Sequence, residues 1–163
     1  MNEKAVILYS MIQKEWPNIE RLFREVKESE NDLAQSKGKA RKREAIYLSY
    51  LIHNMYCSFE TIFKEIAKSF ENHVEDTKQF HAELLRKMNM AIYKMRPAFL
   101  SDGSMALLDE LRRFRHVFRH AYENGIDVDR VAAISERISS HFSSVEKDKS
   151  KFDAFLRQVI ETP

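Results

Sequence analysis

The stretch 107–127, LLDELRRFRHVFRHAYENGID, decides the expected fold, because it combines the apolar pattern of a buried helix with a cluster of arginine and histidine residues. Its apolar residues recur at spacings of four and three, the period of one buried helical stripe. They are Leu107, Leu111, Phe114, Phe118 and Ala121. We expect a helix over about 104–123 that ends at Asn124 and Gly125, since both residues tolerate the left-handed backbone that terminates helices.

The other face of this stretch is cationic, with three arginines and two histidines within nine residues. They are Arg112, Arg115, His116, Arg119 and His120. Histidine as a residue type has an unperturbed pKa of ~6.5, so it can both take and give a proton at neutral pH. Arginine stays charged, and its planar guanidinium binds two phosphate oxygens. Together these groups supply what cleavage of RNA without a metal requires: a base, an acid and charge stabilisation.

Helical patterns also fill the rest of the chain, which predicts an all-α bundle of about five helices. The first segment, about 3–36, keeps its apolar phase through Pro17, so we expect one long helix kinked there. A second helix over about 44–72 is apolar on more than one side and should be central. A last helix is expected over about 129–161.

The third helix is expected between a cap at Asp76 and a stop at Pro97. Its predicted inner face has the spacing of a single helix throughout. The residues of that face are Phe80, Leu84, Met88, Ile92 and Met95.

Composition favours one domain, residues 1–163, of an ordinary globular protein. Hydrophobic residues make up 44% and charged residues 32% of the chain, and only three glycines and three prolines interrupt it. The sequence shows no apolar run of the ~20 residues that a membrane span needs, and no signal peptide. The single cysteine, Cys57, excludes an intrachain disulfide, fits a reducing cytoplasm and is expected to be a small core residue.

The net charge of +2 is nearly balanced, so nucleic-acid binding would have to come from local patches. One such patch is the segment 37–43, which carries five cations around Gly38. It has two interpretations: a solvated connection that leads into the next helix, or a surface that contacts RNA phosphates.

The motif Arg115-x4-His120-x-Tyr122 resembles the R-x4-6-H signature of the HEPN superfamily of metal-independent ribonucleases. More narrowly, it resembles the R-x4-H-x-Y motif of HepT-like toxins. The resemblance extends from about Glu44 to about Val131, and the two ends of the chain match only in helical character. It implies a HEPN-like helical bundle and an endoribonuclease without a cofactor or metal.

By the same resemblance, the catalytic residues would be Arg115 on the phosphate and His120 in proton transfer, with His116 assisting. Arg112, Arg119 and Tyr122 would contact the RNA substrate. The resemblance to HepT-like toxins also implies that the motif tyrosine is a regulatory target, to which an MNT-type nucleotidyltransferase antitoxin attaches AMP. Such bulky anionic groups would neutralise the nearby arginine and block RNA entry.

The motif spacing adds a geometric requirement. At ~100° per residue, Arg115 and His120 differ by roughly 140° around an ideal helix, so they do not share a face. Their convergence on one phosphate needs a local helix distortion, a cleft edge or a twofold partner. HEPN ribonucleases are similar in using a dimer to bring two such motifs together. The resemblance therefore implies a homodimer with a composite active site.

Three other interpretations of this cluster stay open. It could be an ordinary solvated helix face. It could be a zinc site at His116 and His120, although no glutamate follows the first histidine as in the metalloprotease motif. It could belong to a non-catalytic helical subunit that regulates a partner nucleotidyltransferase. His53, in an apolar stretch outside the motif, is expected to be a hydrogen-bonded core residue and not a catalyst. His81 could touch the site, but it is expected to be a surface or structural residue.

Overall fold

The chain folds into helices, as the sequence predicts. The computed structural model describes residues 3–71 and 79–162, with the exception of the Tyr122 side chain; the expected cap Asp76 lies outside these residues. The helices are α1 (Glu3–Gln35), α2 (Gly38–Glu71), α3 (Phe80–Asn89), α4 (Asp102–Arg119), α5 (Ala121–Asn124) and α6 (Val128–Glu161). Since α5 is a single turn, five longer helices form the all-α bundle.

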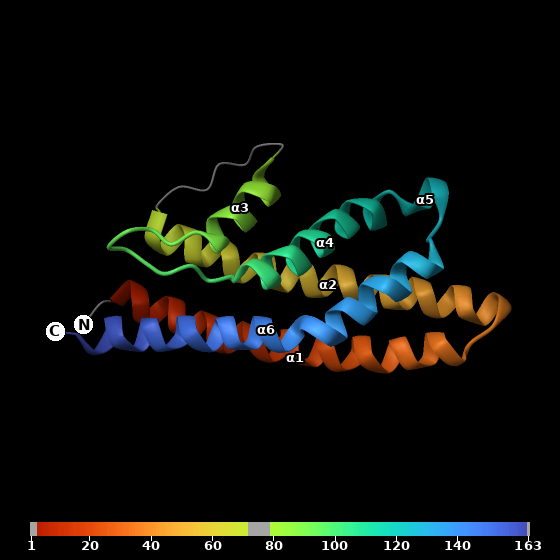
Figure 1. Ribbon diagram of the computed structural model, residues 1–163, viewed down its shortest axis with the longest axis horizontal. Helices are drawn as coiled ribbons and strands as arrows, with labels where there is room; N and C mark the ends of the chain where they lie inside the picture. The colour runs from red at the N-terminus through yellow and green to blue at the C-terminus, as the bar shows by residue number, and fades with distance from the viewer. Residues whose placement is uncertain (1–2, 72–78, 163) are drawn as a thin grey trace.

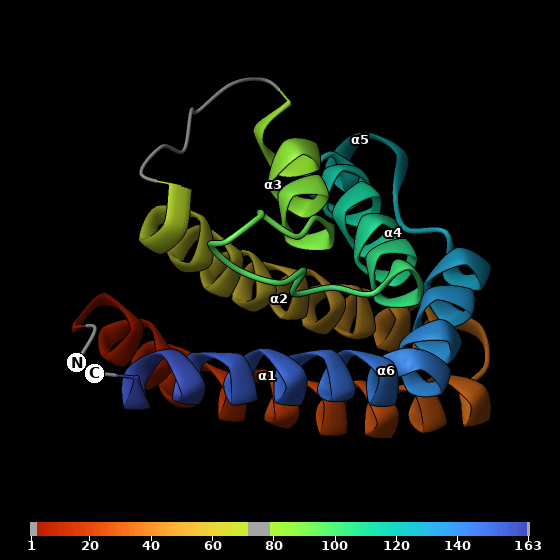
Figure 2. The ribbon, with the colours of Figure 1, turned by 60° about the vertical axis from the view of Figure 1, so that its left-hand side comes forward.

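The helices lie in layers on the two sides of α2. Figures 1 and 2 show α1 and α6 side by side on one side of α2, and α3 and α4 on its other side. The N- and C-terminal ends lie at one end of the bundle, and α5 lies toward the other end, where α1 turns into α2. The prediction that α2 is central is confirmed, because it packs against α1, α3, α4 and α6.

Aromatic side chains join the layers at the centre of the core. Trp16 of α1 meets Phe59 of α2 with ring centroids 6.0 Å apart and Phe142 of α6 at 6.2 Å. Burial of large aromatic side chains is a major source of folding free energy, because each removes about 150–250 Å² from water. One connected core therefore holds all five long helices together.

The first two helices agree with the sequence-based expectations only in part. The expected single first helix is confirmed, since α1 continues through Pro17. The expected start of the second helix near 44 is wrong, because α2 begins at Gly38, which has a positive φ of 57°. Most of the basic segment therefore lies in the first turns of α2, where Arg41 donates to the Leu33 carbonyl at 2.9 Å.

The third helix is shorter than expected, because α3 ends at Asn89 instead of at Pro97. The buried Arg96 guanidinium donates to the carbonyl oxygens of Lys87, Met90 and Pro97 at 2.9, 3.0 and 3.2 Å. Side-chain donors thus satisfy the carbonyls that a continuing helix would have bonded. A tight turn replaces the last two expected turns, with the backbone of Ile92 and Arg96 paired in an isolated bridge.

The motif helix is also interrupted. α4 ends at Arg119, and His120 has φ −111° and ψ 11°, outside helical values, before α5 resumes. The expected stop is confirmed at Gly125, whose φ is 72°. Asp127 then caps α6 by accepting from the backbone N–H groups of Asp129 and Arg130, which stabilises such a helix start by about 1 kcal/mol.

Candidate functional site

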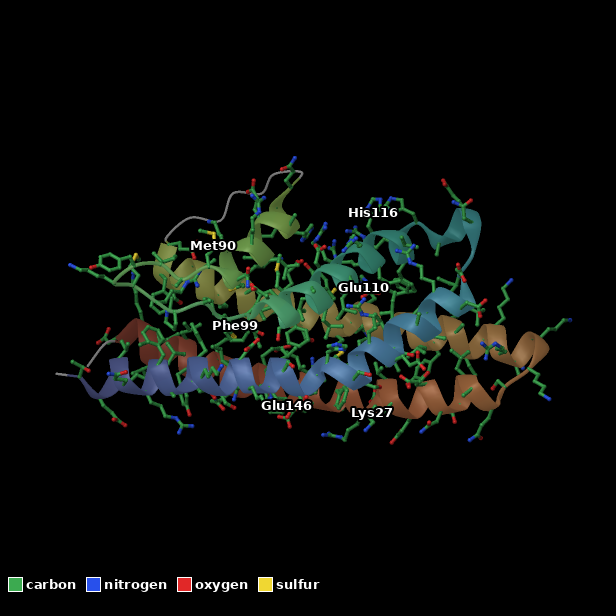
Figure 3. The ribbon with its side chains drawn as sticks, viewed as in Figure 1. Lys27, Met90, Phe99, Glu110, His116 and Glu146 are labelled. Atoms are coloured by element: carbon green, nitrogen blue, oxygen red, sulfur yellow. The ribbon has the colours of Figure 1, made fainter. Side chains whose placement is uncertain are left out.

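The motif residues of α4 differ in how far they are buried. Arg112 and Arg115 are half-buried, whereas His116, Arg119 and His120 are exposed. Figure 3 shows His116 on the outer side of α4. One helix therefore offers two settings, an arginine pair at the edge of the core and a histidine pair toward solvent.

Arg115 points toward α3. Its Nη1–H donates to Nε2 of His81 at 3.3 Å, and its Nε–H is buried without a hydrogen-bond acceptor. An arginine with an unsatisfied buried donor is poorly compensated for the loss of its hydration. Among the described residues Arg115 donates to a ring nitrogen and forms no ion pair, so its positive charge remains available to an anion.

His81 in turn contacts a buried carboxylate on α2. Its Nδ1 lies 2.6 Å from Oε2 of Glu60, and Lys64 lies 3.0 Å from the other oxygen, Oε1. Glu60 is only 5% exposed. Burial acts to raise the pKa of Glu60, but the hydrogen bond from Lys64 and the interaction with His81 outweigh it and lower the pKa below 4.5. Glu60 is thus a buried, charged carboxylate in contact with His81.

Tyr56 lies one turn before Glu60 on the same face of α2 and is fully buried. Burial, and next the Glu60 charge, raise the pKa of Tyr56 well above its ordinary value, while Arg112 and Arg115 act in the opposite direction. Tyr56 is therefore a neutral phenol within the electrostatic reach of both arginines.

His53 lies on α2 beside the end of α4. Its ring packs against that of Phe118 with centroids 5.0 Å apart, and its Nε2 lies 3.7 Å from Sγ of Cys57. Burial lowers the pKa of His53, and the positive charges of Arg115 and Arg119 lower it further. His53 is therefore a neutral ring within the electrostatic reach of both arginines, and Cys57 is half-buried beside it.

The two motif histidines lie close together at the end of α4. Nδ1–H of His120 donates to the His116 carbonyl oxygen at 2.8 Å, and the two ring centroids are 4.5 Å apart. A carbonyl oxygen only accepts, so the hydrogen of the neutral ring must be on Nδ1. Nε2 of the exposed His120 ring then carries the lone pair that can accept a proton.

The described contacts bring together Arg115 with His81, and His116 with His120, but they do not join Arg115 to His120. The helix break occurs at His120 itself, where α4 ends and the direction of the chain changes before α5. The chain therefore carries two separate half-sites, Arg115 with His81 and His116 with His120.

The remaining predicted residues are placed as follows. Arg112 donates to Asp109 at 2.8 Å, which uses part of its charge within α4, and Arg119 is exposed. Tyr122 belongs to α5, but its predicted contacts concern a side chain outside the described structure. In the basic segment, Lys42 and Arg43 are exposed.

Sequence reasoning missed Glu60 as a neighbour of the motif, and it gave contact of His81 with the site only as an alternative. One signal was present: Glu60 stands among Phe59, Ile62 and Phe63 on an apolar helix, and a carboxylate in such a position needs a cationic or hydrogen-bonding partner. The identity of that partner could not be derived, because His81 is 21 residues away along the chain.

Neither a metal site nor a membrane span emerges from the geometry. Within residues 3–71 and 79–162, no three His, Cys, Asp or Glu side chains are grouped so that they could hold an ion, so His116 and His120 gain no third ligand there. Across the same residues, every helix is too short or too polar to cross a lipid bilayer.

Comparison with known families decides the relationship that the motif indicated. A family profile described as HepT-like protein matches residues 47–156, more than half of the chain. The chain belongs to the HepT-like protein family. This family is part of the HEPN ribonuclease superfamily, so the all-α bundle is a HEPN-like fold. No curated protein and no solved structure matches the chain.

The HepT-like region contains both half-sites and leaves out α1 and the first turns of α2. It also extends beyond the expected limit at Val131 through most of α6. The candidate site of this HepT-like chain is therefore built within the shared family region, while α1, outside that region, packs beside α6.

Proposed function

We propose that this HepT-like chain, folded as one domain over residues 1–163, is a metal-independent endoribonuclease. It would act as the toxin of a HEPN/MNT-type toxin–antitoxin pair. In the proposed reaction the 2′-hydroxyl of RNA loses its proton and attacks the adjacent phosphorus, while the bond to the 5′-oxygen breaks and that oxygen takes a proton. Arg115 binds the phosphate oxygens and His120 transfers the proton. DNA is excluded because it lacks the 2′-hydroxyl.

The observation that carries the proposal is the orientation of the His120 ring. Its Nδ1–H is engaged by the His116 carbonyl, so Nε2 is the atom available for proton transfer in an exposed position. A backbone carbonyl that fixes the tautomer is a common way to orient a catalytic histidine. The nearby His116 ring and the exposed Arg119 would assist at the same surface.

A homodimer would unite the two half-sites. On α2, three large hydrophobic side chains are exposed: Ile46 by 47%, Tyr47 by 49% and Tyr50 by 52%. One turn further, His53 packs on Phe118 of the motif helix. An apolar patch beside the motif supports a twofold contact, in which His120 of one protomer approaches Arg115 of its partner.

The test of the dimer pairs two variants. Tyr47→Glu/Tyr50→Glu places two charges in the proposed contact, and Tyr93→Glu places one on a tyrosine that is 85% exposed in the turn after α3. We expect light scattering to find the double variant monomeric and inactive on RNA, and Tyr93→Glu dimeric and active. A double variant that is monomeric but fully active would exclude the composite site.

The central experiment incubates the purified protein with total RNA in a chelator. His120→Ala should abolish cleavage, whereas His141→Ala should not. His141 is a matched control, because it is also an exposed helix histidine whose Nδ1–H donates to a carbonyl four residues earlier, at 3.0 Å. Full activity of His120→Ala would refute the assignment. A wild-type protein that leaves RNA intact would instead favour the non-catalytic subunit that regulates a partner nucleotidyltransferase.

The proposed antitoxin is an MNT-type nucleotidyltransferase that attaches AMP to Tyr122, two residues after His120 in α5. Mass spectrometry after co-expression should find the adduct on Tyr122 and none in a Tyr122→Phe variant. Expression of the chain alone should slow growth, and the partner should restore it. An unmodified Tyr122 in a rescued strain would mean that the antitoxin masks the site.

A further inference from the structure

Three helices contribute to a hydrogen-bonded chain that ends on the Arg115 guanidinium. It runs from Lys64 to Glu60 on α2, from Glu60 to His81 on α3, and from His81 to Arg115 on α4, over 3.0, 2.6 and 3.3 Å. The Glu60 side chain is 6% exposed and that of His81 33% exposed. These hydrogen bonds thus connect the buried face of α2 to the half-buried Arg115 on α4.

The hydrogen bonds fix the protonation of the links. The Glu60 carboxylate accepts, so Nδ1 of His81 carries a hydrogen; Arg115 donates, so Nε2 of His81 carries a lone pair. His81 is therefore a neutral imidazole in this arrangement. It separates the anionic carboxylate from the guanidinium and still offers Arg115 an acceptor.

We propose that Glu60 and His81 are positioning residues for Arg115 in the RNA cleavage proposed above, on which this inference rests. A carboxylate in direct contact with Arg115 would neutralise the cation and compete with phosphate. A neutral imidazole accepts from one guanidinium nitrogen and leaves the positive charge and the remaining Nη–H donors to the substrate. Arg112, by contrast, pairs directly with the Asp109 carboxylate at 2.8 Å.

Two amide variants of His81 separate positioning from mere structural support. In His81→Gln the amide oxygen can replace Nε2 and accept from Arg115. In His81→Asn the shorter amide can replace Nδ1 and donate to Glu60, but it does not reach Arg115. Positioning of Arg115 predicts that Gln retains most of the kcat/KM for RNA and that Asn loses about tenfold or more. If His81 only satisfied Glu60, Asn would retain more activity than Gln.

A double-mutant cycle shows whether the effect passes through Arg115. His81→Asn should lower kcat/KM in the wild-type background and have no further effect in the Arg115→Ala background, because coupled residues are not additive. Equal losses in both backgrounds would overturn the positioning role. Glu60→Gln, which keeps the shape of the side chain but removes its charge, should weaken activity in the same direction as His81→Asn.

A measurement independent of activity completes the test. Nitrogen-15 NMR of the arginine side chains should show Arg115 ordered in the wild-type protein and in His81→Gln, and mobile in His81→Asn. An Arg115 side chain that is equally ordered in both variants would overturn the inference. Wild-type protein that leaves RNA intact would overturn the proposed function instead, and the NMR comparison would still decide whether His81 holds Arg115.

Discussion

Two arginines, Arg96 after α3 and Arg115 in α4, are drawn toward the core in different ways. The Arg96 side chain is 0% exposed and its two Nη groups meet three carbonyl oxygens and the Glu71 carboxylate, the last at 2.6 Å. Arg115 meets one neutral acceptor, His81, at 3.3 Å. In both, the Nε–H is buried without an acceptor.

The difference teaches how to separate a structural arginine from a ligand-binding one. The charge of Arg96 is balanced by Glu71, and its Nη donors close the end of α3, so neither charge nor Nη groups remain for a ligand. The acceptor of Arg115 is the uncharged ring of His81, so no carboxylate in direct contact offsets the positive charge of the guanidinium. The two arginines also differ in burial, since Arg96 is buried and Arg115 is half-buried, but the charge of their acceptors decides whether positive charge remains for a ligand.

The largest expected effect is on folding. Arg96→Ala removes the partner of Glu71 and uncaps the end of α3, so the free energy of unfolding should fall by about 3–5 kcal/mol. Urea denaturation measures this loss. Arg86→Ala, at an exposed position of α3, is the control and should change stability by less than about 0.5 kcal/mol. Similar losses in the two variants would remove the structural role assigned to Arg96.

The second effect is on activity. Arg115→Ala should lower RNA cleavage by about 10²–10³-fold, the loss typical of one charge-stabilising donor, with little loss of stability. Arg113→Ala is the matched control, because Arg113 is an exposed arginine of the same helix that pairs with Asp109. If Arg115→Ala unfolded the protein as Arg96→Ala is expected to do, the comparison between the two arginines would fail.

A smaller effect concerns stability in acid at the Arg96 end. Burial acts to raise the pKa of Glu71, but hydrogen bonds from Arg96 and Lys87 outweigh it and lower the pKa below 4.5. A carboxyl with a lowered folded pKa stabilises the protein above its unfolded pKa, and this contribution is lost as the pH falls through the folded value. Denaturation from pH 6 downward should therefore show a steeper loss in wild-type protein than in Glu71→Gln; equal slopes would contradict the pairing.

The smallest effect reports the field of Arg115. The pKa of His53 is lowered from 6.5 by burial first and then by Arg115 and Arg119. In Arg115→Ala one of these charges is gone, so an NMR titration of the His53 ring should find its pKa raised toward 6.5. Arg113→Ala should leave that pKa where it is. An unchanged pKa of His53 in Arg115→Ala would mean that the charge of Arg115 is screened from the His53 ring.

Local patterns predicted the helices well, and they failed where distant residues intervene. The apolar phase of α1 predicted that one face of the helix is buried, and Leu8 and Leu22 lie on that face in the core. The end of α3 could not be predicted, because Arg96 closes it by bonding to Lys87 and Met90 across a turn.

The candidate site divides in the same way. The sequence by itself predicted that one helical segment carries Arg115, His116 and His120 outside its apolar stripe, and that their spacing keeps Arg115 and His120 off one face of a straight helix. Both conclusions follow from helix periodicity, which is a local property.

Only the tertiary structure decided which neighbours Arg115 has. His81 is 34 residues from Arg115 and 21 from Glu60, and these side chains meet because α3 packs against both α2 and α4. Such contacts depend on the packing of helices that are remote in the chain. Helix periodicity carries no information about them, because it specifies which face of a helix is buried and not which residue of another helix lies against it.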